Sequence, residues 1–128
     1  MDSANKNLVI LIVEDDPALA NLYDEKFKKE NFKTLIARDG AAGLNMAITK
    51  NPDFILLDVM LPKMNGLEML EKLIASPVGK SIPVIVLSNL TEKEEKEKAL
   101  GLGAKDYLSK AMQSPEVIVN KVKKYLEV

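Results

Sequence analysis

The chain has 128 residues and a formal net charge of −1, and it contains no cysteine, no histidine and no tryptophan. This length suits one domain, and 47% hydrophobic with 29% charged residues is typical of a globular protein. Because the sequence contains no cysteine and no histidine, it excludes disulfides, thiolate nucleophiles, cysteine–zinc sites and serine–histidine hydrolase chemistry. The balanced charge disfavours direct nucleic-acid binding, so carboxylates, hydroxyls, amines or a hard metal ion must carry any chemistry.

The N-terminal residues predict neither a signal peptide nor a membrane span. Residues 1–7 form a polar extension with an acidic Asp2, so they lack the basic region of a signal peptide. The first apolar run, 8–13, is too short to cross a bilayer. We therefore expect a cytoplasmic protein without membrane insertion.

The first half of the chain alternates between short apolar runs and helical patterns. Predicted strands lie at 8–13, 32–37 and 53–57. Asp16 and Pro17 begin a predicted helix, because aspartate caps a helix and proline suits its first turn. A second helix begins at Asp39 and ends near Asn51, and residues 61–66 predict a loop.

The second half continues this alternation. Predicted helices lie at 67–74, at 91–100 and from 114 onward, and predicted strands lie at 82–87 and 105–108. The charged stretch 92–98 is interpreted as a solvated helix face, on which Glu92–Lys96 and Glu94–Lys98 are expected to pair.

Five strands that alternate with five helices predict an α/β fold: a parallel sheet covered on both faces. The runs at 8–13, 53–57 and 82–87 are almost entirely apolar, so they belong in the centre of the sheet. The runs at 32–37 and 105–108 are mixed or short and suit its edges. This pattern predicts the doubly wound, flavodoxin-like order 2-1-3-4-5 in a single domain over residues 1–128.

Polar side chains follow four of the predicted strands: Glu14, Asp15 and Asp16 after the first, Asp58 after the third, Ser88 and Asn89 after the fourth, and Ser109 and Lys110 after the fifth. Ligands of open α/β sheets bind outside these carboxyl ends. Carboxylates that meet there repel one another, and Mg²⁺, which prefers oxygen ligands, relieves that repulsion. Lys110 and Ser88 are suited to hold phosphate oxygens, so the sequence predicts a site for magnesium and phosphate.

Four motifs together resemble the receiver domain of two-component response regulators, most closely a single-domain receiver of the chemotaxis type. They are Val-Glu-Asp-Asp at 13–16, Leu-Leu-Asp-Val-Met-Leu-Pro at 56–62 with Gly66, Val-Leu-Ser at 86–88 and Tyr-Leu-Ser-Lys at 107–110. The similarity runs from about Leu8 to the C-terminus. Each motif alone is weak, but four in order, each at a strand end, form a specific signal.

The resemblance implies a role for each site residue. Asp58 is implied to accept a phosphoryl group from the phosphohistidine of a histidine kinase or phosphotransfer protein. The implied Mg²⁺ ligands are Asp15, Asp58 and the Met60 backbone carbonyl, with Glu14 acting through water. Lys110 and Ser88 would hold the phosphoryl oxygens.

The resemblance also implies a switch rather than a turnover enzyme. Ser88 would move toward the phosphate and Tyr107 would turn inward, which would change the surface around the fourth helix, fifth strand and fifth helix. The implied output is a contact with an unidentified protein target, made by a monomer or a weak, phosphorylation-dependent dimer. Tyr107 could equally be half-buried packing.

Three other functions compete with this one. A pseudo-receiver would keep the fold and bind partners without phosphorylation. A phosphatase of the haloacid-dehalogenase type needs a second aspartate two positions after Asp58, where Met60 stands. A flavin carrier needs a phosphate loop after the first strand, where the acidic residues 14–16 would repel phosphate.

Several residues depart from the family pattern. Ala111 follows Lys110 where the family usually has proline, so we predict a trans peptide bond there. Asn89 is bulkier than the usual residue and would narrow access to Asp58. Met60 and Leu90 are apolar at positions where polar side chains can orient an attacking water, which predicts a long-lived phosphoryl group.

Overall fold

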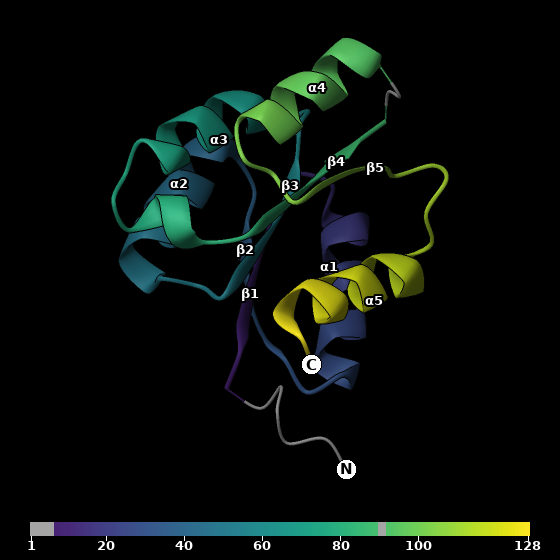
Figure 1. Ribbon diagram of the computed structural model, residues 1–128. Coiled ribbons are helices and arrows are strands. Elements are labelled where there is room, and N and C mark those ends of the chain that lie inside the picture. The colour runs from purple at the N-terminus through teal and green to yellow at the C-terminus, as the bar shows by residue number, and fades with distance from the viewer. Residues whose placement is uncertain (1–6, 90–91) are drawn as a thin grey trace.

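The computed structural model describes residues 7–89 and 92–128 and contains a five-stranded parallel sheet (Figure 1). The strands are β1 (Val9–Val13), β2 (Lys33–Ala37), β3 (Phe54–Asp58), β4 (Val84–Ser88) and β5 (Asp106–Ser109). The helices are α1 (Pro17–Lys29), α2 (Gly40–Lys50), α3 (Gly66–Ile74), α4 (Lys93–Gly101) and α5 (Pro115–Leu126), with a 3₁₀ turn at Gly79–Ser81. The strand order is β2-β1-β3-β4-β5, which confirms the predicted doubly wound topology.

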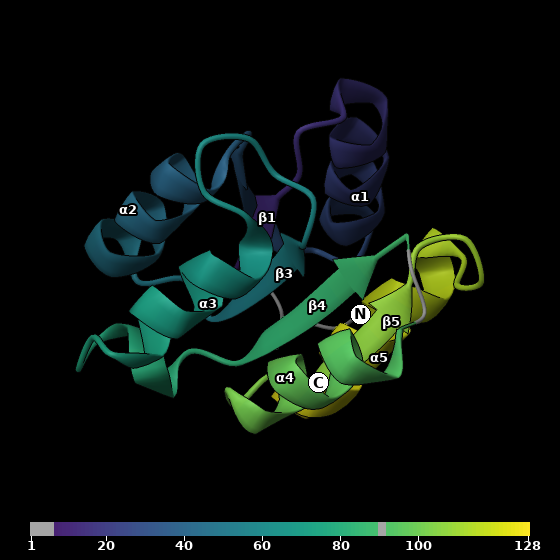
Figure 2. The ribbon, with the colours of Figure 1, turned by 90° about the horizontal axis from the view of Figure 1, so that it is seen from above.

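The sheet separates two layers of helices. In Figure 1, α1 and α5 lie on one side and α2, α3 and α4 on the other, and Figure 2 shows α1 and α2 on opposite sides of β1. One apolar cluster joins the sheet to the second group, including Ala47, Leu70 and Ala99. The other joins it to the first group, including Phe27 and Ile118. All five residues of β3 are buried, as expected for a strand covered on both faces.

Polar side chains fix where the helices begin. Asp16 Oδ1 accepts hydrogen bonds from the backbone N–H groups of Ala18 at 3.0 Å and Leu19 at 3.4 Å, which places the first turn of α1 beside the end of β1. Asp39 Oδ1 accepts from the N–H of Ala42 at 2.7 Å and starts α2. The predicted cap at Asp16 is confirmed, and each of the two aspartates satisfies backbone donors that its helix leaves unpaired.

Some local expectations need correction. Strands β3 and β4 extend through Asp58 and Ser88, so these residues end their strands instead of following them. Within α4 the ion pair is Lys93–Glu97 at 4.0 Å, and the expected pairs Glu92–Lys96 and Glu94–Lys98 do not form, because long exposed side chains gain little from any one partner. The N-terminal residues 1–6 and residues 90–91 lie outside the described residues. Among the helices that are described, none is both long and apolar enough to cross a membrane.

Candidate functional site

The carboxyl ends of the central strands bring the predicted site residues to one edge of the sheet. Glu14 follows β1 directly, Asp58 and Ser88 are the last residues of β3 and β4, and Lys110 follows β5. Backbone hydrogen bonds continue the parallel pairing past the strand ends, with Lys110 N–H donating to Ser88 O at 2.9 Å. The register of the sheet therefore fixes the order of these side chains along the edge.

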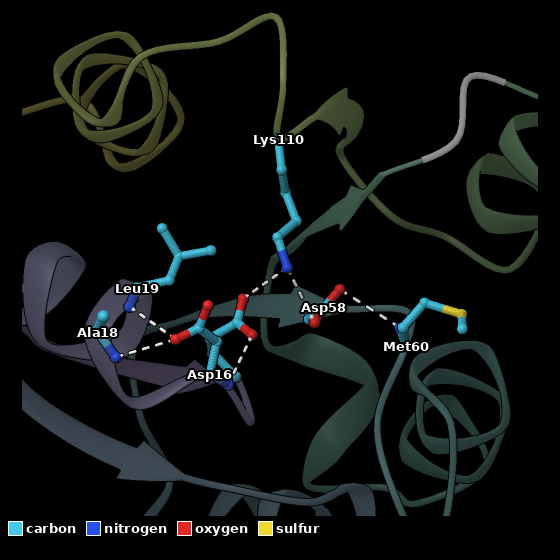
Figure 3. A network of polar contacts seen from close by, with 7 residues as sticks. Asp16, Ala18, Leu19, Asp58, Met60 and Lys110 are labelled. Carbon is cyan, nitrogen blue, oxygen red and sulfur yellow. Dashed lines mark hydrogen bonds and ion pairs between the residues drawn. The ribbon is translucent and has the colours of Figure 1, made fainter.

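Lys110 connects two nearly buried carboxylates. Its Nζ lies 2.9 Å from Glu14 Oε1 and 3.1 Å from Asp58 Oδ2. The exposed fractions of these side chains are 10% for Lys110 and 2% for each acid. In Figure 3 the Lys110 side chain extends across the strand ends to Asp58. One ammonium group thus compensates two negative charges that are shielded from water.

The remaining carboxylate oxygens are held by backbone N–H groups. Glu14 Oε2 accepts from the N–H of Asp16 at 3.1 Å, and Asp58 Oδ1 accepts from the N–H of Met60 at 3.3 Å. Each acid therefore has one oxygen on Lys110 and the other on the backbone of the loop that follows its own strand. These contacts fix the orientation of both carboxylates.

Burial and the charge of Asp58 act on Glu14 in the same direction. Burial raises the pKa of the Glu14 carboxyl from 4.5 to about 7, and the negative charge of Asp58 contributes to the rise, while hydrogen bonds from Lys110 and the Asp16 N–H oppose it. Burial lowers the pKa of Lys110, but its contacts with Glu14 and Asp58 outweigh this and raise the pKa overall. Lys110 therefore stays charged between the two acids.

The raised pKa of Glu14 predicts a pH-dependent stability. Between pH 4.5 and about 7 the folded protein holds a proton on Glu14 that the unfolded chain has lost. The free energy of unfolding should thus fall by about 3 kcal/mol as the pH rises through this range. Urea unfolding in EDTA at several pH values measures this fall, with few competing titrations because the chain has no histidine. The Glu14→Gln variant should lose the dependence; an equal fall in that variant would contradict the assignment.

The acidic residues at this edge offer oxygen ligands for a cation. One carboxylate oxygen each from Glu14, Asp15 and Asp58 lie within 4.8 Å of one another. Asp15 is exposed while the other two are buried, so the group opens to solvent on one side. Three carboxylates without nitrogen or sulfur donors fit a hard divalent cation such as Mg²⁺.

Gly66 packs directly against the backbone that carries Asp58. A Cβ atom at position 66 would lie 2.2 Å from the Asp58 carbonyl oxygen and 2.8 Å from Val59 Cα. The Gly66 N–H also donates to Val59 O at 2.8 Å. The chain must return this close to let α3 begin beside β3, and only glycine leaves the room.

Ser88 and Tyr107 lie on the neighbouring strands β4 and β5, and both are buried, with exposed fractions of 1% and 6%. The Tyr107 hydroxyl donates to the Glu95 carboxylate on α4. Tyr107 is thus neither half-buried nor exposed, and Glu95 is no plain surface residue. The sequence missed this contact because Glu95 sits in a uniformly charged stretch with no local pattern that distinguishes it.

The structure also describes most of the positions that depart from the family pattern. The Lys110–Ala111 peptide bond is trans, as predicted. Asn89 is exposed at the end of β4, and Met60 has an exposed fraction of 61%. Leu90 lies outside the described residues.

Comparison with known proteins agrees with this doubly wound fold and its acidic strand-end site. A family model described as the response regulator receiver domain matches residues 10–123. The chain belongs to this family.

Relatives and solved structures agree. The chain is 34% identical over 111 residues to the alkaline phosphatase synthesis transcriptional regulatory protein PhoP of Bacillus subtilis, covering 87% of this chain and 45% of that protein. A CheY-like receiver domain protein from Methanospirillum hungatei superposes with a TM-score of 0.87 at 28% identity over 94% of each chain. The Mn²⁺-bound form of response regulator Rcp1 superposes with a TM-score of 0.80 at 30% identity over 93% of this chain and 94% of that one.

The chain thus spans under half the length of this curated relative. The shared part is the receiver domain, so the fold and the regulatory family carry over to this chain. The transcriptional regulatory role in the name of the longer protein belongs to that protein.

Proposed function

We propose that this protein is a phosphoryl-accepting switch in which Asp58 receives the phosphoryl group. The observation that carries the proposal is the bridge from Lys110 to both Glu14 and Asp58 beside a cluster of three carboxylates. A lysine within 3.1 Å of the acceptor carboxylate lies where an oxygen of an attached phosphoryl group would need positive charge. The family membership supports the same role.

The transfer would proceed by attack of an Asp58 carboxylate oxygen on phosphorus. The bond between phosphorus and the donor breaks, and the donor leaves with the bonding electron pair, so that an acyl phosphate forms on Asp58. Lys110 would turn from the carboxylate to a phosphoryl oxygen, and Ser88 would donate its hydroxyl hydrogen to another. Asp15, Asp58 and the Met60 carbonyl would hold Mg²⁺, with Glu14 acting through water, and the cation supplies charge neutralisation.

The donor is proposed to be the phosphohistidine of a kinase or phosphotransfer protein, because the chain belongs to the response regulator receiver family. The new dianionic group would draw Ser88, rearrange Tyr107 and change the surface of α4, β5 and α5. That surface would control contact with a protein target, either as a monomer or through a weak dimer. The proposed setting is the cytoplasm.

The test uses acetyl phosphate and Mg²⁺ with intact-protein mass spectrometry. We expect one phosphoryl group per chain, and none when EDTA replaces Mg²⁺. The pseudo-receiver alternative predicts no adduct under either condition. That result would overturn the proposal.

The phosphoryl group on Asp58 is expected to be long-lived. The exposed Met60 side chain has no polar atom that orients a hydrolytic water toward Asp58. After the donor is removed, the adduct on the wild type should decay more slowly than the adduct on Met60→Gln, by about tenfold or more. The glutamine amide can position a hydrolytic water, which the methionine side chain does not. Met112, which is also exposed, at 76%, gives the control Met112→Gln, whose adduct should decay like that of the wild type. Rapid decay of the wild-type adduct would count against this prediction.

A further inference from the structure

A chain of hydrogen bonds runs from the phosphorylation site to α4. The Tyr107 hydroxyl donates to the Glu95 carboxylate. Burial and the Glu95 contact raise the pKa of Tyr107, whereas a side-chain hydrogen bond with Ser88 lowers it. Because the single hydrogen of the phenol is donated to Glu95, the Ser88 hydroxyl must be the donor in its bond with the phenol oxygen, so the hydrogen bonds run from Ser88 to Tyr107 to Glu95.

This series of hydrogen bonds links three elements and ends on the charged carboxylate of Glu95. Ser88 ends β4, Tyr107 lies on β5, and Glu95 is in the first turn of α4. Hydrogen bonds that end on an ionised carboxylate are stronger than neutral ones, and linked bonds polarise one another. The Glu95 charge therefore strengthens the bond between Tyr107 and Ser88, although Glu95 does not touch Ser88.

Among the described residues, few other contacts hold the first turn of α4. Ala99, near its C-terminal end, is the buried residue of this helix, and its other residues, except for a half-buried Glu95, are exposed. Its N-cap residue, Glu92, makes no capping hydrogen bond. Within the described part of the chain, the contact between Glu95 and Tyr107 is thus the main polar anchor of this turn.

We propose that Glu95 is a positioning residue that sets how readily the site takes up phosphate; this rests on the proposed function of Asp58. Through Tyr107 it holds the Ser88 hydroxyl and the first turn of α4 in the unphosphorylated arrangement. A phosphoryl group on Asp58 competes for the Ser88 hydroxyl. Losing that donor weakens the bond from Tyr107 to Glu95 and releases the first turn of α4.

The coupling works in both directions. Because linked equilibria are reciprocal, weakening the Glu95 contact must favour the phosphorylated state by as much as phosphorylation weakens the contact. A substitution at Glu95 also raises the population of the released arrangement before the reaction, and it thereby changes the rate of phosphoryl uptake without touching Asp58, Lys110 or a proposed cation ligand.

The first measurement tests the contact itself. The protein is labelled with 3-fluorotyrosine, which gives one fluorine resonance for each of its three tyrosines, and Tyr107→Phe identifies the Tyr107 signal. We expect this signal to shift in Glu95→Ala and Glu95→Gln. It should stay in place in Glu94→Ala, a control on the exposed face of the same turn. An unchanged Tyr107 signal in both Glu95 variants overturns the proposal.

The second measurement is the rate of phosphoryl uptake from acetyl phosphate with Mg²⁺. Loss of one hydrogen bond of ordinary net strength should make Glu95→Ala about fivefold faster than Glu94→Ala, with Glu95→Gln between them. Glu95→Ala should add nothing in a Tyr107→Phe background, because its effect passes through the phenol. If Glu95 had a purely structural role, Glu95→Ala would still change the rate of phosphoryl uptake in the Tyr107→Phe background.

The outcomes separate the two proposals. Without an adduct on the wild type, the proposed function fails and this inference fails with it. If the wild type takes up phosphate but Glu95→Ala is no faster than Glu94→Ala, or keeps its effect without the phenol, only the role of Glu95 is overturned.

Discussion

Asp58→Asn is expected to abolish the phosphoryl adduct that the wild-type protein forms with acetyl phosphate and Mg²⁺. The amide has nearly the same shape as the carboxylate, but its oxygen is a poor nucleophile and a weaker cation ligand. The substitution also removes the negative charge that helps to raise the pKa of Glu14, so the folded state should be retained. Intact-protein mass spectrometry measures the adduct, and urea unfolding verifies the fold.

Asp39→Asn is the matched control for this substitution. Asp39 caps α2 through the N–H of Ala42, and asparagine caps helices about as well as aspartate. This variant should take up one phosphoryl group at the wild-type rate. An adduct on Asp58→Asn would show that another residue accepts the phosphoryl group.

Gly66→Ala is expected to destabilise the protein by about 3 kcal/mol or more. The added Cβ would lie 2.2 Å from the Asp58 carbonyl oxygen and 2.9 Å from its carbonyl carbon. These are backbone atoms of a buried central strand, so no side-chain rotation relieves the overlap and the strand end must move. Because the moving segment carries Asp58, phosphoryl uptake should also slow. Urea unfolding gives the change in stability.

Gly101→Ala is the control for this prediction. A Cβ atom at this last residue of α4 meets nothing within 4 Å, and alanine favours helix over glycine. This variant should be unchanged or more stable by up to about 1 kcal/mol. If both alanine variants unfold alike, the close approach of Gly66 to β3 is not required.

Much of the fold could be predicted because its signals are local. The apolar runs 8–13 and 54–57 identify central strands by composition, and Asp16 with Pro17 marks the start of α1. Once the strands are parallel and ordered, Asp58 and Lys110 must share an edge. The candidate site then follows from topology, before any distance is known.

Other features had no local signal. The Glu95 contact joins residues 12 positions apart through the packing of α4 beside β5, and nothing in the charged stretch 92–98 separates Glu95 from its neighbours. The prediction of the ion pairs within α4 was wrong for a related reason. Exposed charges have several partners of nearly equal energy, so spacing alone does not select one.

Periodicity and residue chemistry are properties of short segments. The order of amino acids was therefore enough to predict the alternation of strands and helices, the parallel sheet, and the acidic and basic residues at the strand ends. Three features became visible only in the folded protein: Lys110 bridges Glu14 and Asp58, burial raises the pKa of Glu14, and Glu95 holds Tyr107. Burial and pairing depend on which distant segments exclude water together, and that is decided when the layers pack.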